Sequence, residues 1–261
     1  MRPMTAAAIT CALILALPAQ SADQATGYLD SAHVPDVTKL LGPPPAAGSG
    51  TKTGDVATFR ATRSLQGSPR WRLAASDADY GAGPMLHDFS CVLGARLDPA
   101  TAPALAGLLT RLTFDSSNTE RSAKSYYRRP RPFVEIGGPI CVTPDDYLKK
   151  SYSYPSGHST YSWTVGLVLA DIAPDHTAAI LARARTYGES RVVCGVHYES
   201  DVQAGRLAAT ALFGALQSNP TFRKDLEAAR AELARLRSHP VAAPDKAQCE
   251  LEAGAVGHPV W

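Results

Sequence analysis

The sequence predicts an all-α protein, folded as a single-domain helical bundle with an extended N-terminal arm. Three observations lead to this fold class. Apolar residues recur with the spacing of helix faces, no window shows the alternation typical of a β-strand, and cap residues and prolines stand where the periodic segments begin or end. A chain of 261 residues, 45% of them hydrophobic and 19% charged, is long enough for one domain with a substantial core.

The first 54 residues are expected to lie outside the bundle. Residues 1–22 have the pattern of a secretory signal peptide, in which Arg2 precedes an apolar run and small residues precede a cleavage point after Ser21 or Ala22. The apolar run is too short to span a bilayer, so we expect a cleaved signal and a periplasmic or secreted protein. Residues 23–54 are rich in Pro, Gly and small polar residues, which predicts the extended arm.

Helices in the first half of the bundle are predicted from apolar stripes and turn residues. The last of them must end near Arg128, because Pro130 and Pro132 disfavour helix in the residue before each. The predicted helices cover residues 55–65, 69–78, 85–93, 105–112 and 118–127.

The second half begins at Ser156, a predicted N-cap for a helix that ends at Ile172. A capping box formed by Ser200 and Gln203 predicts another helix start, and Asn219-Pro220 predicts the start of the last helix. The tail after Pro240 shows no periodicity. The predicted helices cover residues 156–172, 176–193, 201–217 and a stretch from 220, so that the domain spans 55–240 and residues 241–261 form a C-terminal tail.

Removal of the signal peptide would leave four cysteines, Cys91, Cys141, Cys194 and Cys249. An even number in an exported protein predicts two disulfides, for which three connectivities are open. Of these we favour Cys91–Cys141 together with Cys194–Cys249. The scattered spacing does not resemble a zinc site, and no metal site is expected.

Three clusters carry residues suited to chemistry. In the first, Lys124 stands in the last turn of a predicted helix and Arg131 in the rigid Pro-flanked segment beyond it. Taken alone, this cluster is also typical of a solvated basic patch at a helix end.

The second cluster, Pro155-Ser156-Gly157-His158, forms a turn into a helix. The N–H groups of Gly157 and His158 would face outward at the positive end of the helix dipole, which is an anion site. Ser156 can cap the helix, bind the anion or do both. The alternative is an ordinary capped helix start.

The third cluster holds Arg191, His197 and Asp201. Arg191 and His197 are six residues apart and cannot share a helix face, but a break at Gly195 can turn the chain back so that both face one pocket. Asp201 can accept the Nδ1–H of His197 and leave Nε2 free to attack. The alternative is a structural His–Asp bond at a helix start.

Together and in this order, the clusters resemble the three-part signature of the type 2 phosphatidic-acid phosphatase superfamily. Within it, the strings Arg-Ser-Ala-Lys and Ser-Tyr-Pro-Ser-Gly-His are similar to those of class A bacterial non-specific acid phosphatases. The chain departs from the family pattern at Tyr152, Ser159 and Glu199. The resemblance implies a helical bundle of the kind that these phosphatases share with vanadium-dependent haloperoxidases.

The resemblance also implies hydrolysis of phosphate monoesters with broad specificity and without a metal or other cofactor. His197 would be the nucleophile that forms a phosphohistidine, Asp201 would orient it, and His158 would protonate the leaving group and later act as the base. An acidic optimum is expected, since His158 must begin protonated. The implied phosphate ligands are Lys124, Arg131, Ser156, Gly157 and Arg191.

The expected substrates are nucleotides, sugar phosphates and aryl phosphates, with inorganic phosphate as product, and a homo-oligomer is expected. The net charge of +2 and the lack of a basic tract with interleaved aromatics argue against nucleic acid. No later segment suits a membrane span, so integral membrane association is not expected. Arg121, Arg128 and Arg129 are expected to be solvated.

Three alternatives remain open from sequence. A vanadium-dependent haloperoxidase shares this set of anion-binding residues. A lipid phosphatase could act peripherally at a membrane. A helical protein could also bind phosphate without turning it over.

Overall fold

The computed structural model describes residues 26–261, and this part of the chain folds into eleven α-helices and three short 3-10 helices, without a β-strand. The all-α, single-domain prediction is confirmed. The predicted signal peptide, residues 1–22, lies outside the described residues. Within the predicted arm, the 3-10 helix η1 (Val37–Lys39) interrupts the irregular chain, and helix α1 (Gly50–Thr62) begins inside the range expected to be extended.

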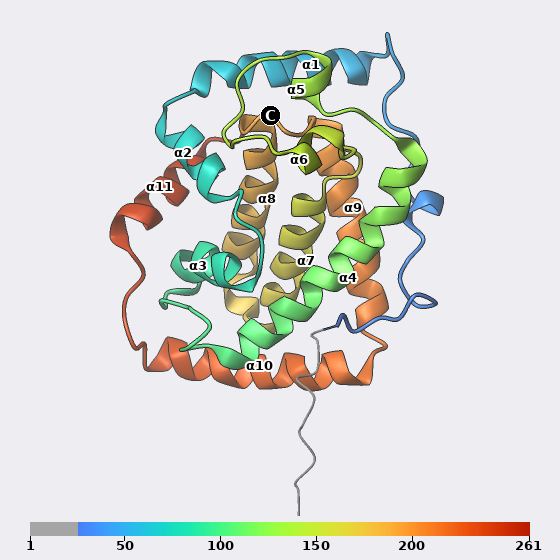
Figure 1. Cartoon of the computed structure of the whole chain (residues 1–261). Helices are drawn as coiled ribbons and strands as arrows, with labels where there is room; N and C mark the ends of the chain where they lie inside the picture. The colour runs from blue at the N-terminus through green and yellow to red at the C-terminus, as the bar shows by residue number, and fades with distance from the viewer. Residues whose placement is uncertain (1–25) are drawn as a thin grey trace, which may run out of the picture.

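Three helices, α7 (Gly157–Ile172), α8 (Thr177–Val193) and α9 (Glu199–Leu216), form the centre of the bundle. The long helix α4 (Pro103–Tyr127) crosses them, α10 (Pro220–Ser238) runs across one end, and α1 runs across the opposite end (Figure 1). The main core lies between these elements, and burying each large side chain there stabilises the fold by about 1.5–3 kcal/mol. Among its buried residues are Phe89, Leu109, Tyr161, Tyr187, Leu212 and Leu233.

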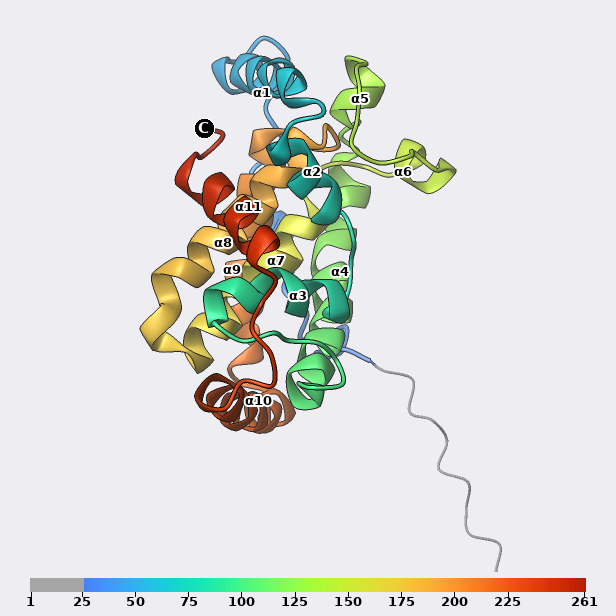
Figure 2. The ribbon, with the colours of Figure 1, turned by 90° about the vertical axis from the view of Figure 1, so that its left-hand side faces the viewer.

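The remaining elements pack around this frame. Helices α2 (Pro69–Ser76), α3 (Ala82–Leu93) and α11 (Lys246–Gly257) lie along one side, and two short helices, α5 (Pro132–Glu135) and α6 (Asp146–Lys150), stand apart from the bundle near its α1 end (Figure 2). The 3-10 helices η2 (Arg63–Leu65) and η3 (Pro174–His176) connect neighbouring helices. None of the described helices is long and apolar enough to cross a membrane.

Helix α11 corrects the prediction that the tail is without regular structure. Asp245 is the N-cap of this helix, and its side chain accepts a hydrogen bond from the N–H of Gln248 at 2.7 Å. Only Glu252 and Ala255 of this helix are buried. With so few core contacts, no apolar stripe marks α11 in the sequence.

The two helices predicted at residues 105–112 and 118–127 are one continuous helix, α4. The polar stretch between them is part of this helix and packs into the bundle, with Asp115 and Ser116 buried, and the Thr113 hydroxyl donates to the carbonyl of Thr110 at 2.6 Å. The helix ends as predicted at Arg128, which takes a left-handed conformation with φ of 50°.

The predicted start of α9 is wrong by two residues. Tyr198, and not Ser200, is the N-cap, and the carboxylate of Asp201 accepts the Tyr198 N–H at 2.8 Å. The residue at the third helical position therefore completes the capping box in place of Gln203. Asp201 therefore makes two contacts: its carboxylate caps the start of α9 and also faces His197.

The predicted disulfide connectivity is also wrong, because the pairs are Cys91–Cys249 and Cys141–Cys194. Cys249 lies on α11, which returns along the side of the bundle to the end of α3, where Cys91 lies (Figure 2). Cys141 lies in the loop between α5 and α6, and its N–H donates to the carbonyl of Cys194 at 3.0 Å. Neither disulfide could be predicted from local sequence, since both depend on how distant segments of the chain fold back on one another.

Candidate active site

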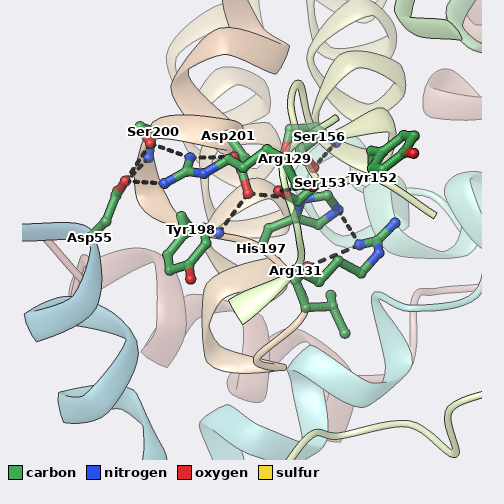
Figure 3. A network of polar contacts seen from close by, with 12 residues as sticks. Asp55, Arg129, Arg131, Tyr152, Ser153, Ser156, His197, Tyr198, Ser200 and Asp201 are labelled. Atoms are coloured by element: carbon green, nitrogen blue, oxygen red, sulfur yellow. Dashed lines mark hydrogen bonds and ion pairs between the residues drawn. The ribbon is translucent and has the colours of Figure 1, made fainter. Parts of the chain in front are cut away.

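The structure brings the three sequence clusters together at the end of the bundle covered by α1 (Figures 1 and 3). Each cluster stands at a helix terminus or in the turn beside one. Lys124 is in the last turn of α4, Ser156 caps α7, Arg191 is in the last turn of α8, and Asp201 is in the first turn of α9.

His197 is buried, with 2% of its surface exposed, and both of its ring nitrogens have partners. Arg131 Nη1 lies 3.0 Å from Nε2, and Asp201 Oδ2 lies 3.4 Å from Nδ1 (Figure 3). A guanidinium can only donate, so Nε2 accepts and the ring proton belongs on Nδ1, facing the carboxylate. Burial, with the positive charges of Arg131, Lys124 and Arg191, holds the pKa of His197 well below its usual range. The imidazole is therefore neutral, with its lone pair on Nε2.

The turn between α8 and α9 places His197 beside Arg191. Gly195 has φ of +86°, and the N–H groups of Val196 and His197 both point back to the carbonyl of Arg191, at 3.1 and 3.3 Å. The chain reverses direction here, as expected from the glycine. A Cβ at Gly195 would also clash with Arg63, whose guanidinium bonds to the carbonyls of Val192 and Val193.

Three cationic side chains, Arg131, Lys124 and Arg191, act on His197 through their charge. The Lys124 ammonium lies 3.0 Å from the carbonyl of Tyr152 and 3.0 Å from Glu120 Oε2. Arg131 donates from Nε and Nη2 to Ser151 Oγ, each at 3.1 Å, and Arg191 donates from Nη1 to the carbonyl of Asp77 at 3.3 Å. These partners are mostly neutral oxygens, so the positive charge is left largely uncompensated.

Burial and neighbouring positive charge lower the pKa values of two of these cations, Lys124 and Arg131. Burial and the charge of Arg131 lower the pKa of Lys124 to about 7, although Asp201 opposes the change. Burial and the charge of Arg191 lower the pKa of Arg131 to about 10. An anion bound here would relieve both the burial cost and the mutual repulsion, so the site favours a multiply charged anion.

The N-terminus of α7 adds backbone N–H groups to the cations of the site. Ser156 Oγ accepts the N–H of Ser159 at 3.3 Å, and its own N–H donates to the carbonyl of Asp201 at 2.9 Å, which ties α7 to α9. Gly157 is the first residue of this helix, where backbone N–H groups lack intrahelical acceptors. A Cβ at Gly157 would lie 2.9 Å from Glu120 Oε1, so a side chain here would have to displace the Glu120 carboxylate.

His158 is half-buried and faces the same site as His197. Its Nε2 donates to the carbonyl of Ala78 at 3.1 Å, its ring meets Tyr80 edge-on at 5.0 Å, and it stacks near Tyr187 at 6.4 Å between centroids. Burial and the charge of Arg191, with smaller contributions from His197 and Arg131, hold the pKa of His158 well below its usual range. An anion among these cations would raise the pKa again.

Residues 77–79, after α2, contact the site through three successive backbone carbonyls. Asp77 O accepts from Arg191, Ala78 O accepts from His158, and Asp79 O accepts the Tyr187 hydroxyl at 3.1 Å. The Asp77 carboxylate holds this segment in place, because it pairs with the fully buried Arg183 at 2.7 Å. No local pattern marks this segment in the sequence, since backbone acceptors are present in every residue.

Arg129 corrects another expectation, because it is buried at 5% exposure and not solvated. Its Nη1 donates to Asp201 Oδ1 at 2.5 Å, and its Nη2 donates to Asp55 Oδ2 at 2.7 Å (Figure 3). Arg121 and Arg128 are exposed, as expected. Sequence reasoning missed both Arg129 and Asp55, and only the turn after Arg128 distinguishes one neighbouring arginine from the other.

Within residues 26–261, no three His, Cys, Asp or Glu side chains lie close enough together to hold a metal ion. The groups available for binding a ligand are three cations, a helix N-terminus and two histidines. Such a set can bind a phosphate or a similar oxyanion and transfer its central atom to a nitrogen nucleophile.

Comparison with known proteins gives consistent relatives. A family model described as the PAP2 superfamily matches residues 98–223. An acid phosphatase from Zymomonas mobilis is 44% identical over 84% of this chain and 83% of its own length. Non-specific acid phosphatases from Providencia stuartii and Salmonella typhimurium are 41% and 38% identical, over 80% and 74% of this chain and 86% and 78% of their own lengths.

Proposed function

Because this chain belongs to the acid phosphatases of the PAP2 superfamily, we propose that it hydrolyses phosphate monoesters by forming a phosphohistidine on His197. One observation carries the proposal above all. The neutral Nε2 of His197 lies at the edge of a group of three cations, while Nδ1 faces the carboxylate of Asp201. A nitrogen nucleophile so placed is suited to attack a bound phosphoryl group.

In the first step, the lone pair of His197 Nε2 attacks phosphorus, and the bond from phosphorus to the ester oxygen breaks. Lys124, Arg131 and Arg191 stabilise the charge that spreads over the phosphoryl oxygens, with the N-terminus of α7. The leaving oxygen takes a proton from His158. Asp201 stabilises the positive charge that develops on the imidazole of His197.

In the second step, a water molecule attacks the phosphorus of the phosphohistidine. His158, now neutral, takes a proton from this water, and the bond from phosphorus to Nε2 breaks. Inorganic phosphate leaves, and His197 and His158 return to their starting states. Each proton and each bond is balanced by groups of this chain, the ester and water, so the proposed reaction is metal-independent.

An acidic optimum follows from the two lowered histidine pKa values. His197 must be neutral to attack, and its lowered pKa keeps it neutral well into the acidic range. His158 must be protonated, and its lowered pKa means that this form is lost as the pH rises. The negative charge of a bound substrate's phosphate raises the pKa of His158, so the productive combination of protonation states forms on substrate binding at acidic pH.

The proposed substrates are small phosphomonoesters, including nucleotides, sugar phosphates and aryl phosphates. The proposed location is the periplasm or the exterior, for which the two disulfides give independent support, since disulfides persist in oxidising compartments. The homo-oligomer stays a prediction from the family resemblance.

The test is hydrolysis of p-nitrophenyl phosphate at several pH values in the presence of EDTA. We expect wild-type activity to persist in EDTA, to be greatest at acidic pH, and to fall by at least about 10⁴-fold in His197→Ala. His87→Ala is the matched control, because His87 lies on α3 with half of its side chain exposed. Activity that survives in His197→Ala would overturn the mechanism, and halide oxidation with vanadate and peroxide in place of hydrolysis would overturn the activity.

A further inference from the structure

Both carboxylate oxygens of Asp201 have hydrogen-bond partners. Oδ2 accepts the N–H of Tyr198 at 2.8 Å and lies 3.4 Å from Nδ1 of His197, while Oδ1 accepts from Nη1 of Arg129 at 2.5 Å (Figure 3). The plane of the carboxylate is therefore fixed from the side opposite His197. Rotation of Asp201 away from the imidazole would break the contact with Arg129.

Arg129 is itself fixed by three further contacts. Its Nη2 donates to Asp55 Oδ2 at 2.7 Å, its Nη1 donates to Ser200 Oγ at 2.7 Å, and its guanidinium lies over the Tyr198 ring at 4.1 Å. The planar guanidinium binds two carboxylates in one defined orientation, which an ammonium group could not do.

Asp55 closes the network from helix α1. Its Oδ1 accepts the N–H of Ser200 at 2.9 Å, and its Oδ2 accepts the Ser200 hydroxyl at 2.6 Å. Asp55, Arg129 and Asp201 are 2%, 5% and 0% exposed. The network thus connects α1, the segment after α4 and the start of α9 in the interior of the protein.

Burial of two carboxylates and one guanidinium has a large desolvation cost, so this network is weak support for stability by itself. It is better explained by orientation, because its end point is the carboxylate that faces His197. Helix α1 also lies outside residues 98–223, which the family model matches. The last member of the network therefore comes from a part of the chain beyond the three sequence clusters.

We propose that Arg129 and Asp55 are positioning residues that hold the Asp201 carboxylate against His197, so that α1 takes part in orienting the nucleophile. This inference rests on the proposed role of His197. Neither Arg129 nor Asp55 is among the proposed phosphate ligands, and both act through Asp201.

The experiment uses the full mature chain with Arg129→Lys and Asp55→Asn. Arg129→Lys keeps a positive charge but cannot bind both carboxylates in the plane of the original guanidinium. Asp55→Asn is nearly isosteric and removes the charge that orients Arg129. We expect kcat for p-nitrophenyl phosphate to fall about tenfold to a hundredfold in each variant, the range seen when outer partners of active-site ligands are lost, with KM changed by less than about threefold.

A double-mutant cycle separates positioning from a structural role. In the Asp201→Asn background, Arg129→Lys is expected to lower kcat by less than about threefold further, because no carboxylate remains to be positioned. Arg230→Lys is the control, since it breaks an arginine–carboxylate pair with Asp171 on the far part of the bundle and should leave kcat unchanged. Thermal unfolding of every variant shows whether each one is folded.

A second readout does not depend on turnover. A histidine Nδ1–H bonded to a carboxylate gives a proton NMR resonance far downfield, and this resonance is expected in the wild type and shifted or lost in both variants. Wild-type-like kcat and an unchanged resonance in Asp55→Asn would overturn the inference, and so would equal losses in the presence and absence of Asp201. If wild type does not hydrolyse the substrate, the proposed function fails, and the resonance still tests the positioning.

Discussion

Lys124 is expected to make phosphate binding depend on pH. Burial, together with the positive charge of Arg131, lowers the pKa of Lys124 to about 7. The protonated form is the cation, so the site holds three positive charges below this pH and loses one as the pH rises through it. The variable to change is therefore the pH. Two variants are compared with the wild type: Lys124→Gln removes the charge at every pH, and Lys124→Arg keeps it.

The size of the effect can be worked from the site. Two unit charges 4 Å apart interact by about 4 kcal/mol at an effective dielectric constant of 20. Glu120 already lies 3.0 Å from the ammonium, and the Lys124 side chain is 15% exposed, so we take about half of this value. A loss of about 2 kcal/mol corresponds to a roughly thirtyfold weaker binding of phosphate.

The assay is KM for p-nitrophenyl phosphate from pH 5 to pH 9 in the three enzymes. Ionisation of the substrate phosphate, with a second pKa of about 6, is common to all of them and cancels in the ratio of KM values. The ratio of Lys124→Gln to wild type is expected to be roughly thirty at pH 5 and to approach one by pH 9. Lys124→Arg is expected to keep a low KM to higher pH than wild type. A ratio for Lys124→Gln that stays constant across this range would refute the reasoning.

Three further outcomes are expected. Asp201→Asn should lower kcat by about 10²–10⁴-fold with the fold intact, as measured by steady-state kinetics and circular dichroism. Opening Cys141–Cys194 by Cys141→Ser should lower the free energy of unfolding by about 4 kcal/mol and also reduce activity, whereas Cys249→Ser should lower stability and leave kcat near wild type, because only the first pair borders the site. Gly205→Ala should destabilise the protein by about 1–3 kcal/mol in thermal unfolding, since its Cβ would lie 2.7 Å from the carbonyl of Ser156; an unchanged unfolding temperature would contradict this close packing of α7 on α9.

The parts of the site that local sequence could predict are those in which spacing alone defines the chemistry. Ser156 is a favoured N-cap residue followed by an apolar helix, and the offset from His197 to Asp201 places the two side chains at one helix end. The helical bundle was predictable for the same reason, because the apolar stripes of α3 and α10 repeat within a few residues.

Contacts between distant segments could not be predicted in this way. Asp55 meets Arg129 across 74 residues, and nothing in either local sequence marks the partner. Arg128 and Arg129 are adjacent and chemically alike, yet the left-handed turn at Arg128 leaves one exposed and buries the other. The predicted disulfide connectivity was wrong for a related reason, because α11 lacks the apolar stripe that would have predicted its return to α3.

The contacts made by residues 77–79 have a consequence for how mutations at this site will be tolerated. Arg191 and His158 are held here by main-chain oxygens, which every amino acid supplies. We therefore expect substitutions of Ala78 and Asp79 to cause little loss of activity in a mutational scan. At these two positions the site depends on the path of the backbone, so we expect a change in loop length to be damaging where a change of side chain is silent.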